Sequence, residues 1–245
     1  MFYFENIEGK KILKSSLIKD AQAFFTTRDI CICDKGLNNN GAVVQNRQQV
    51  AKYLNLAPEN LIYPTQTHST NIDMADISRH DYPETDALIL KDKNLAVFLN
   101  FADCTPIILY DEKQNIGAVS HAGWRGTGGK IGSLTVKKLV SEFGSNPQDI
   151  VGVIGPAIGF CCYDVGEEVY EKLSKTVSDF SGMFEIREGK IFVDLKGINK
   201  RQLEEAGVER IDVCPYCTVH NNDLFYSYRN ENGTTLRHSA VLKLN

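Results

Sequence analysis

The stretch LAVFLNFADCTPIILYDEKQNIGAVSH, residues 95 to 121, decides the fold class. Its short runs of β-branched and aromatic residues predict strands at 95–101, 106–110 and 116–120, and the preceding apolar run predicts one at 87–90. The polar segment DEKQN between the last two runs predicts a hairpin turn. We therefore expect β-sheet structure in the most apolar part of the chain.

The hydrophobic period changes downstream of these strands. Apolar residues at nearly helical spacing predict a helix at 130–143, and Gly144 just past its end suits a helix C-cap. The other expected elements are a strand at 150–154, a helix around 166–173, a short helix after Asn199, a strand near Ile211, and one or two strands between Leu224 and Leu242. Because strands and helices interleave without strict βαβ repetition, we predict an α+β fold: one compact mixed α/β domain, residues 1–245, with mixed β-sheets flanked by helices.

Composition limits the classes of function. The 245 residues are 42% hydrophobic and 24% charged, as in an ordinary globular protein. A net charge of −4 argues against a nucleic-acid binder, which usually carries a basic face. No apolar run could cross a bilayer, and the start, MFYFENIEGK, lacks the features of a secretory signal. We expect a cytoplasmic protein without nucleic-acid or membrane partners, and the sequence does not indicate an oligomeric state.

Seven cysteines are an odd number, which favours free thiols, metal ligands or catalytic thiolates over a disulfide framework. CPYC at 214–217, followed by His220, resembles half of a metal or redox motif, but no second such pair is present. Cys161 and Cys162 are adjacent in sequence, and adjacent cysteines do not easily share a tetrahedral ion. We therefore expect Cys214 and Cys217 to serve packing, with a structural role for one of them as the alternative.

Two imidazoles and one thiol stand at ends of predicted strands. His68 lies in PTQTHST, Cys104 lies in FADCTPIILY, and His121 ends IGAVSH. Nitrogen and sulfur are ligands that Zn²⁺ prefers, and three protein ligands leave a fourth position for water or substrate. A small core cysteine and hydrogen-bonded histidines would give the same spacing, so the pattern leaves both interpretations open.

The segment HAGWRGTGGK, residues 121–130, holds the only tryptophan of the chain. Its glycines lead into the predicted helix, where free backbone amides could bind an anion such as phosphate, and Arg125 could add a bidentate donor. The alternative is a tight turn whose glycines need positive φ angles. We expect Trp124 to lie in the core, away from any substrate.

Several motifs occur together and in order along most of the chain. They are QNR at 45–47, TQTHS at 65–69, ADCTPIILYD at 102–111, HAGWRGT at 121–127, IGPAIGFCCYDVG at 154–166, CT at 217–218 and SYR at 227–229. This combination resembles the YfiH-like, laccase-domain family, also described as multicopper polyphenol oxidases.

The resemblance implies a mixed α/β fold with one zinc ion held by His68, Cys104 and His121. It also implies a purine nucleoside enzyme that phosphorolyses adenosine, inosine, guanosine and methylthioadenosine and deaminates adenosine. A bacterial branch of the family is associated with editing of peptidoglycan precursors. The sequence departs from the family by lacking a double glycine after Arg28 and by having Leu236 in place of a glycine, and we expect both departures to alter the pocket rim.

Chemistry favours zinc over copper. A multicopper oxidase needs many histidine ligands, and this chain has five histidines. One zinc ion with an open position suits activation of water for attack at C6 of adenine. Asp103, next to a predicted ligand, could act as a proton shuttle or could orient a zinc-bound histidine.

Phosphorolysis needs cationic groups that hold phosphate beside the ribose. Arg47 and Arg125 are the first candidates, and Arg229 and Arg237 follow them. The predicted catalytic residues are therefore Arg47, Asp103, Cys104 and Arg125. The residues predicted to bind substrate or phosphate are Arg47, Gln66, Arg125, Gly126 and Thr127.

Two other functions remain open. Cys104 could be the nucleophile of a cysteine hydrolase with His121 as base, acting on an amide of a cell-wall precursor. Alternatively, the chain could be a non-catalytic nucleotide-binding or scaffolding module.

Overall fold

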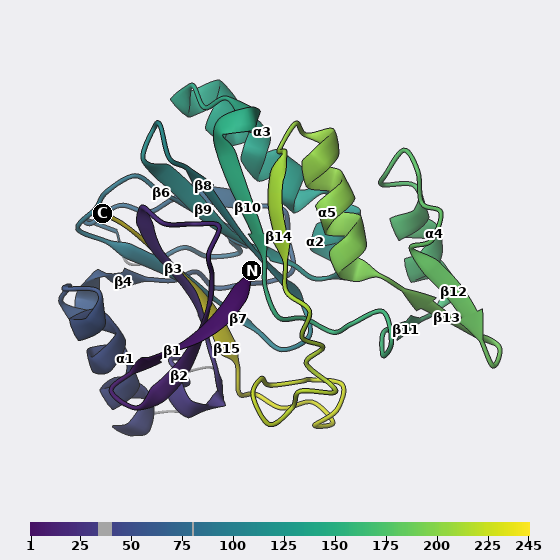
Figure 1. Cartoon of the computed structure of the whole chain (residues 1–245), viewed down its shortest axis with the longest axis horizontal. Helices are drawn as coiled ribbons and strands as arrows, with labels where there is room; N and C mark the ends of the chain where they lie inside the picture. The colour runs from purple at the N-terminus through teal and green to yellow at the C-terminus, as the bar shows by residue number, and fades with distance from the viewer. Residues whose placement is uncertain (34–40, 80) are drawn as a thin grey trace.

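Two six-stranded β-sheets pack face to face at the centre of the computed structural model, which describes residues 1–33, 41–79 and 81–245 (Figure 1). The strands of the first sheet are, in spatial order, β1 (Phe2–Ile7), β2 (Lys10–Ser15), β3 (Ala21–Thr26), β15 (His238–Leu244), β7 (Ala96–Phe101) and β4 (Leu61–Ile62). Those of the second sheet are β14 (Arg210–Val213), β10 (Ile150–Ile154), β8 (Thr105–Asp111), β9 (Ile116–Ala122), β6 (Ala87–Leu90) and β5 (Ile72–Met74). A small third sheet contains β11 (Asp164–Val165), β13 (Lys190–Val193) and β12 (Phe184–Arg187).

Helices cover the outer faces of the two large sheets. The α-helices of the described residues are α1 (Gly41–Tyr53), α2 (Trp124–Gly128), α3 (Ile131–Phe143), α4 (Glu167–Ser174) and α5 (Leu195–Glu205). Short 3-10 turns occupy Arg28–Ile30, Pro58–Asn60 and Pro147–Asp149. Helix α1 packs on the first sheet, α3 and α5 pack on the second, and α4 lies with the small sheet at one end of the molecule (Figure 1). None of the helices described is long and apolar enough to span a bilayer.

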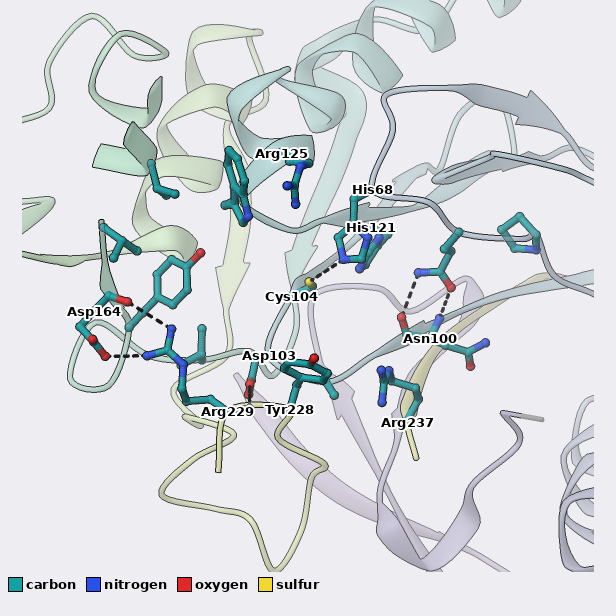
Figure 2. Close-up of a pocket in the computed structure, with 18 of the residues that line it drawn as sticks. His68, Asn100, Asp103, Cys104, His121, Arg125, Asp164, Tyr228, Arg229 and Arg237 are labelled. Atoms are coloured by element: carbon teal, nitrogen blue, oxygen red, sulfur yellow. Dashed lines mark hydrogen bonds and ion pairs between the residues drawn. The ribbon is translucent and has the colours of Figure 1, made fainter. Parts of the chain in front are cut away.

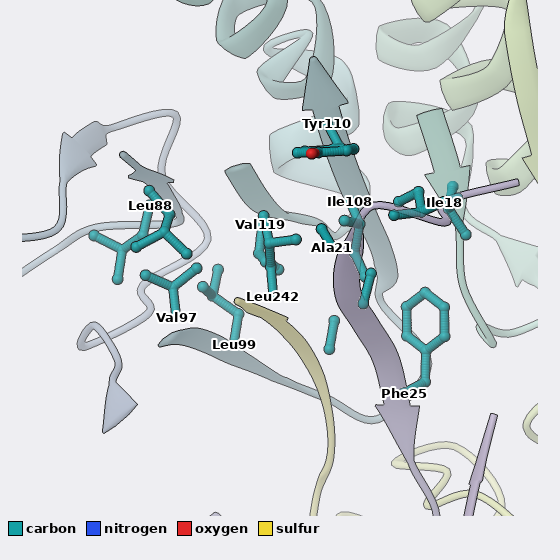
Figure 3. Packing of buried hydrophobic residues seen from close by; sticks show 14 of the residues in the cluster. Ile18, Ala21, Phe25, Leu88, Val97, Leu99, Ile108, Tyr110, Val119 and Leu242 are labelled. Atoms are coloured by element: carbon teal, nitrogen blue, oxygen red, sulfur yellow. The ribbon is translucent and has the colours of Figure 1, made fainter. Parts of the chain in front are cut away.

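Strand β8 shows how residue alternation builds these layers. Ile108 and Tyr110 point into the core between the two large sheets, which Figure 3 shows from close by. Ile107 and Leu109 belong to the second core, under α3 and α5. Successive side chains of a strand point to opposite faces of the sheet, so a continuous apolar run serves both cores.

The β8–β9 hairpin brings two predicted ligands to one end of the second sheet. The strands pair antiparallel from Asp111 opposite Ile116 to Thr105 opposite Ala122. His121 therefore lies opposite Pro106, and Cys104 lies immediately before the first residue of β8.

The structure confirms the predicted α+β fold class with mixed sheets flanked by helices. The strands at 87–90 and 150–154, the 111–115 hairpin and the helix ending before Gly144 occur as expected, and Gly144 has φ +71° in the left-handed region. Of the one or two strands predicted between Leu224 and Leu242, one forms: it begins at His238, and residues 224–237 form turns and irregular backbone. Helix α5 begins at Leu195, before the predicted start.

His238 is a fully buried histidine that serves the core rather than a ligand site. Its ring lies against Phe101 and Phe225, and its Nε2–H donates to the carbonyl oxygen of Pro156 at 3.3 Å. Among the described residues its Nδ1 has no hydrogen-bond partner. Burial lowers the pKa of His238 to about 3; the hydrogen bond to Pro156 opposes this shift, and the positive charges of Arg237 and Arg28 add to it.

This histidine makes the fold sensitive to acid. The unfolded chain takes up the proton at a pKa near 6.5, whereas the folded chain does so near 3, so protons favour the unfolded state between these values. The free energy of unfolding should fall by up to about 1.4 kcal/mol per pH unit from this group as the pH drops below 6.5. The free energy of unfolding, measured with urea across this pH range, should fall less steeply with decreasing pH for His238→Gln than for wild type. Identical slopes for the two proteins would contradict the assignment.

Candidate active site

His68, Cys104 and His121 converge, as the sequence predicts. His68 lies in the loop after β4, Cys104 lies in the turn between β7 and β8, and His121 lies near the end of β9. One ligand atom from each residue lies within 4.8 Å of the others, and Cys104 Sγ is 3.7 Å from His68 Nε2. Figure 2 shows the three side chains together in the middle of a pocket.

Asp86 organises this cluster, and sequence reasoning missed it. Its fully buried carboxylate accepts five hydrogen bonds. The donors are the backbone N–H groups of Thr67, His68 and Ser69, the Ser69 hydroxyl and His121 Nδ1, the last at 2.7 Å. The only sequence signal was an acidic residue directly before the apolar strand ALIL, where a charge must either reach solvent or be paired.

The hydrogen bond from His121 Nδ1 to Asp86 fixes the imidazole tautomer and leaves Nε2 for Cys104 and for a metal ion. Burial raises the pKa of Asp86, but the His121 hydrogen bond and charge and the Ser69 donors lower it to about 2. Burial would likewise raise the pKa of the Cys104 thiol, yet the positive charge of His121 and hydrogen bonds from His121 and His68 lower it to about 6. Burial opposes protonation of His121, whereas Cys104 and Asp86 raise its pKa.

The donor set fits a zinc ion. Two imidazole nitrogens and one readily formed thiolate are zinc ligands, and His121 already carries the buried carboxylate partner typical of a metal-bound histidine. Three protein ligands facing a cavity leave a position for water or substrate.

Gly123 explains part of the glycine-rich segment after His121. A Cβ atom at this position would lie 2.9 Å from Cys104 Sγ and 3.0 Å from His68 Cδ2, so a larger residue would press on two of the three proposed ligands. The glycines of 123–129 have no positive φ angles, and the left-handed residue of the segment is Lys130. The alternative interpretation, a tight turn whose glycines need positive φ angles, was therefore wrong, and close approach is the physical reason for Gly123.

The ligand cluster opens into a cavity of about 830 Å³. Aromatic rings, amides and charged groups from distant parts of the chain line it. Among them are Tyr63, Trp124, Tyr163, Tyr228, Asn100 and Gln66. Gln66 exchanges two hydrogen bonds with the backbone of Asn100, so its amide is held at the wall. Trp124 is half-buried and lines the cavity, so the expectation that it lies in the core was wrong.

Three arginines line the cavity: Arg125, Arg229 and Arg237. In Figure 2, Arg125 lies on one side of the ligand cluster and the other two lie on the opposite side. The Arg125 guanidinium stacks 4.2 Å from the centre of the Trp124 ring and is exposed. Arg229 pairs with Asp164, whereas Arg237 donates to the carbonyl oxygens of Thr234 and Leu236.

Arg47 does not lie where the sequence analysis expected it. It lines a separate depression of about 330 Å³, where its guanidinium donates to the carbonyl oxygen of Ile32 and stacks on the Tyr63 ring. Tyr63 lines both hollows and stands between Arg47 and the cavity. The prediction that Arg47 contacts substrate is therefore not supported by its position.

Gly126 and Thr127 are buried within α2 and do not line the cavity. The Thr127 N–H donates to the carbonyl oxygen of Gly123, and the Thr127 hydroxyl and carbonyl accept from Asn199 and Gln202. Their position does not support the expectation that they bind phosphate, because neither residue lines the cavity and the Thr127 N–H, hydroxyl and carbonyl already have partners.

Asp103 lines the cavity but does not contact His121. Its carboxylate accepts from the Thr218 hydroxyl at 2.6 Å and from the backbone N–H of Arg229 at 2.7 Å. The alternative in which Asp103 orients a zinc-bound histidine was therefore wrong, since Asp86 has that place. Its role as a proton shuttle stays a prediction.

Comparison with known proteins places this site in a family. The family described as multi-copper polyphenol oxidoreductase laccase matches residues 32–245. The chain belongs to this family. Purine nucleoside phosphorylase YlmD of Bacillus subtilis (strain 168) is 32% identical, over 89% of this chain and 87% of its own length. Adenosine deaminase RL5 of an unknown prokaryotic organism is 30% identical, over 91% of this chain and 94% of its own.

Solved structures of the family share the fold. The crystal structure of the Bacillus licheniformis hypothetical protein YfiH superposes with a TM-score of 0.91 at 30% identity, covering 99% of both chains. That of YlmD from Geobacillus stearothermophilus also gives 0.91, covering 99% of this chain and 98% of its own. The resemblance to the YfiH-like, laccase-domain family is thus confirmed.

We expect Gly123→Ala to weaken zinc binding at this site by about 10- to 100-fold, as loss of ligand-orienting contacts typically does. The added methyl group would displace Cys104 and His68 from their present positions. Zinc content after dialysis against a chelator should fall by one equivalent per chain relative to wild type. Gly41→Ala is the matched control, because a Cβ there meets none of the described atoms within 4 Å, and equal zinc retention by both variants would contradict the geometry.

Proposed function

We propose that the chain is a zinc-dependent purine nucleoside enzyme that phosphorolyses adenosine, inosine, guanosine and methylthioadenosine and deaminates adenosine. The observation that carries this proposal is the triad of His68, Cys104 and His121 at the wall of a cavity that also presents arginines and aromatic rings. The names of the relatives, purine nucleoside phosphorylase and adenosine deaminase, support the same chemistry.

The cavity suits a nucleoside together with phosphate. Its volume of about 830 Å³ lies in the range of small-molecule sites. The rings of Trp124, Tyr163 and Tyr228 offer apolar faces for a purine base, and such stacking tolerates different bases. The wall amide of Asn100 is held by a hydrogen bond from the Ser239 hydroxyl to its Oδ1. Aromatic faces together with a fixed amide support a pocket that accepts several purine nucleosides.

Phosphorolysis joins a phosphate oxygen to ribose C1′ while the bond from C1′ to the base nitrogen breaks, and the base leaves with the bonding pair and takes up a proton. Cationic side chains stabilise the phosphate and position it for this displacement. Arg125 carries no carboxylate partner among the described ion pairs, whereas Arg229 is partly neutralised by Asp164. Arg125 is therefore the principal phosphate-binding residue in this proposal, and Arg237 is the second.

His68, Cys104 and His121 line the part of the cavity where the metal ion would bind. When bound, zinc would supply Lewis acidity that makes water a competent nucleophile near neutral pH. Asp86 keeps His121 in the required tautomer and holds the backbone of His68 in its left-handed conformation, φ +62°. Asp103, which lines the cavity next to Cys104 in sequence, remains the proposed carboxylate for proton transfer.

The ligand inventory supports zinc rather than a multicopper cluster. Of the five histidines, His68 and His121 form the proposed site, His238 is buried in the core, and His220 lies in a separate group of side chains. His80 lies outside the described residues. Two histidines and one cysteine at the cavity are too few for a laccase-type cluster.

The proposal separates metal binding from phosphate binding. Cys104→Ala and His121→Ala should each remove one zinc equivalent and both activities. Arg125→Ala should keep the zinc and lose at least about 100-fold in kcat/KM for phosphorolysis, because a cation that stabilises developing charge is removed. Arg210→Ala is the control, since Arg210 is exposed on β14 and binds Glu112. A zinc-free wild type with full activity would overturn the scheme.

A specific observation favours a second candidate, a cysteine hydrolase. In such an enzyme Cys104 would be the nucleophile, His121 the base and Asp86 the carboxylate that orients His121. The pKa of the Cys104 thiol is lowered, as a nucleophile requires. Such a triad could cleave an amide of a cell-wall precursor.

His68→Ala discriminates between these functions, because His68 belongs to the zinc site but not to the hydrolase triad. The zinc enzyme should lose adenosine turnover with and without phosphate, and chelation of wild type should reproduce that loss until zinc is restored. Undiminished turnover of a peptidoglycan-precursor amide by His68→Ala and by chelated wild type would favour the hydrolase instead.

A further inference from the structure

A second set of soft metal ligands lies behind one wall of the cavity. It joins the loop after β10 to the loop after β14, two segments far apart in sequence. One ligand atom from each of its members lies within 4.8 Å of the others. The members, termed here the thiol cluster, are Cys161, Cys162, Cys217 and His220.

The local backbone overcomes the difficulty that the sequence suggested for adjacent cysteines. The N–H groups of Cys162 and Tyr163 both donate to the carbonyl oxygen of Gly159, which closes a tight turn. Both neighbouring thiols reach the same imidazole: Cys161 Sγ lies 3.6 Å from His220 Nδ1, and Cys162 Sγ lies 3.2 Å from His220 Nε2. The two thiols therefore converge on one imidazole although the cysteines are adjacent in sequence.

The CPYC motif is divided between two roles. Cys214 packs in the core between the two large sheets, as predicted. Cys217 joins the thiol cluster instead, and His220 follows it after two residues, so one turn supplies a thiol and an imidazole. Closely spaced ligand pairs of this kind are common in structural zinc sites.

Backbone groups around Cys217 favour a thiolate over a packing thiol. The Gly159 N–H donates to Cys217 Sγ at 3.2 Å. A Cβ at Gly159 would lie 3.0 Å from Cys161 Sγ and from Cys217 Cβ, so this glycine leaves room where the ligands meet.

We propose that the thiol cluster binds a structural Zn²⁺, separate from the site at His68, Cys104 and His121. Three sulfurs and one nitrogen make a complete tetrahedral set without an open position, which is the composition of structural zinc sites. Binding releases the remaining thiol protons to solvent, and the exposed side chains of Cys161 and His220 give the ion an entry path. The proposal does not depend on nucleoside chemistry.

The ion would fix the wall of the cavity. Residues Ala157 and Cys217 form a β-bridge, and the Thr218 N–H donates to the Ala157 carbonyl oxygen. The Thr218 hydroxyl donates to Asp103, and the Asp103 carbonyl oxygen accepts from the N–H of Ile158, which lines the cavity. One ion bridging the two loops would therefore hold Asp103 and its neighbours in position.

Zinc titration of the reduced, chelator-stripped full chain tests this proposal. Wild type should bind two equivalents, Cys104→Ala should bind one, and Cys104→Ala combined with Cys217→Ser should bind none. Cobalt in the Cys104→Ala chain should give intense thiolate-to-cobalt absorption that Cys217→Ser abolishes. Cys104→Ala combined with Cys214→Ala is the matched control and should keep its one equivalent, because Cys214 packs in the core.

A folded Cys104→Ala chain, checked by circular dichroism, that binds no zinc would overturn the proposal. A disulfide in the freshly purified chain would also overturn it, and thiol titration would then find two fewer than the seven thiols of the sequence. If Cys217→Ser does not fold, His220→Ala in the Cys104→Ala background replaces it, because His220 is exposed, and unchanged zinc affinity would contradict the assignment. If Cys104→Ala binds one zinc equivalent, the structural zinc site is supported even when wild type turns over no nucleoside.

Discussion

The Asp86 carboxylate is the constraint on which the site depends. A buried charge is tolerated only when hydrogen bonds and opposite charge compensate its lost hydration, and Asp86 obtains both from the loop around His68 and from His121. The same bonds that satisfy the carboxylate position two proposed metal ligands from different parts of the chain. The β8–β9 hairpin then adds Cys104, whose thiolate is favoured by the adjacent imidazoles.

Sequence reasoning succeeded where local patterns determine structure. Short continuous apolar runs identified the central strands, and a helical run ending before Gly144 identified α3. It did not predict β1, β2, β3 and α1. Strand β3 pairs with β15 at the other end of the chain, and such long-range pairing leaves no local signal. Strands β1 and β2, in contrast, form a local hairpin, which the pattern analysis overlooked.

The site was predicted unevenly for similar reasons. His68, Cys104 and His121 are rare residue types in ordered motifs, so a resemblance could identify them. Arg47 and the amides of Gly126 and Thr127 carry equally suitable chemistry, but only tertiary structure shows that they lie behind Tyr63 or inside α2. Asp86 and the thiol cluster were missed because their partners are separated by long stretches of sequence. In both cases the clue is tertiary: Asp86 is a buried carboxylate with five donors, and the thiol cluster gathers four potential ligands from two loops.

In the proposed function, His68, Cys104 and His121 hold a zinc ion, and Asp86 positions it through His121. The sharpest test is X-ray diffraction from crystals of the zinc-loaded chain, recorded on both sides of the zinc absorption edge. We expect an anomalous peak at ligand distance from His68 Nε2, Cys104 Sγ and His121 Nε2, with His121 Nδ1 still bonded to Asp86. A zinc-loaded crystal with no peak among these three side chains would contradict it.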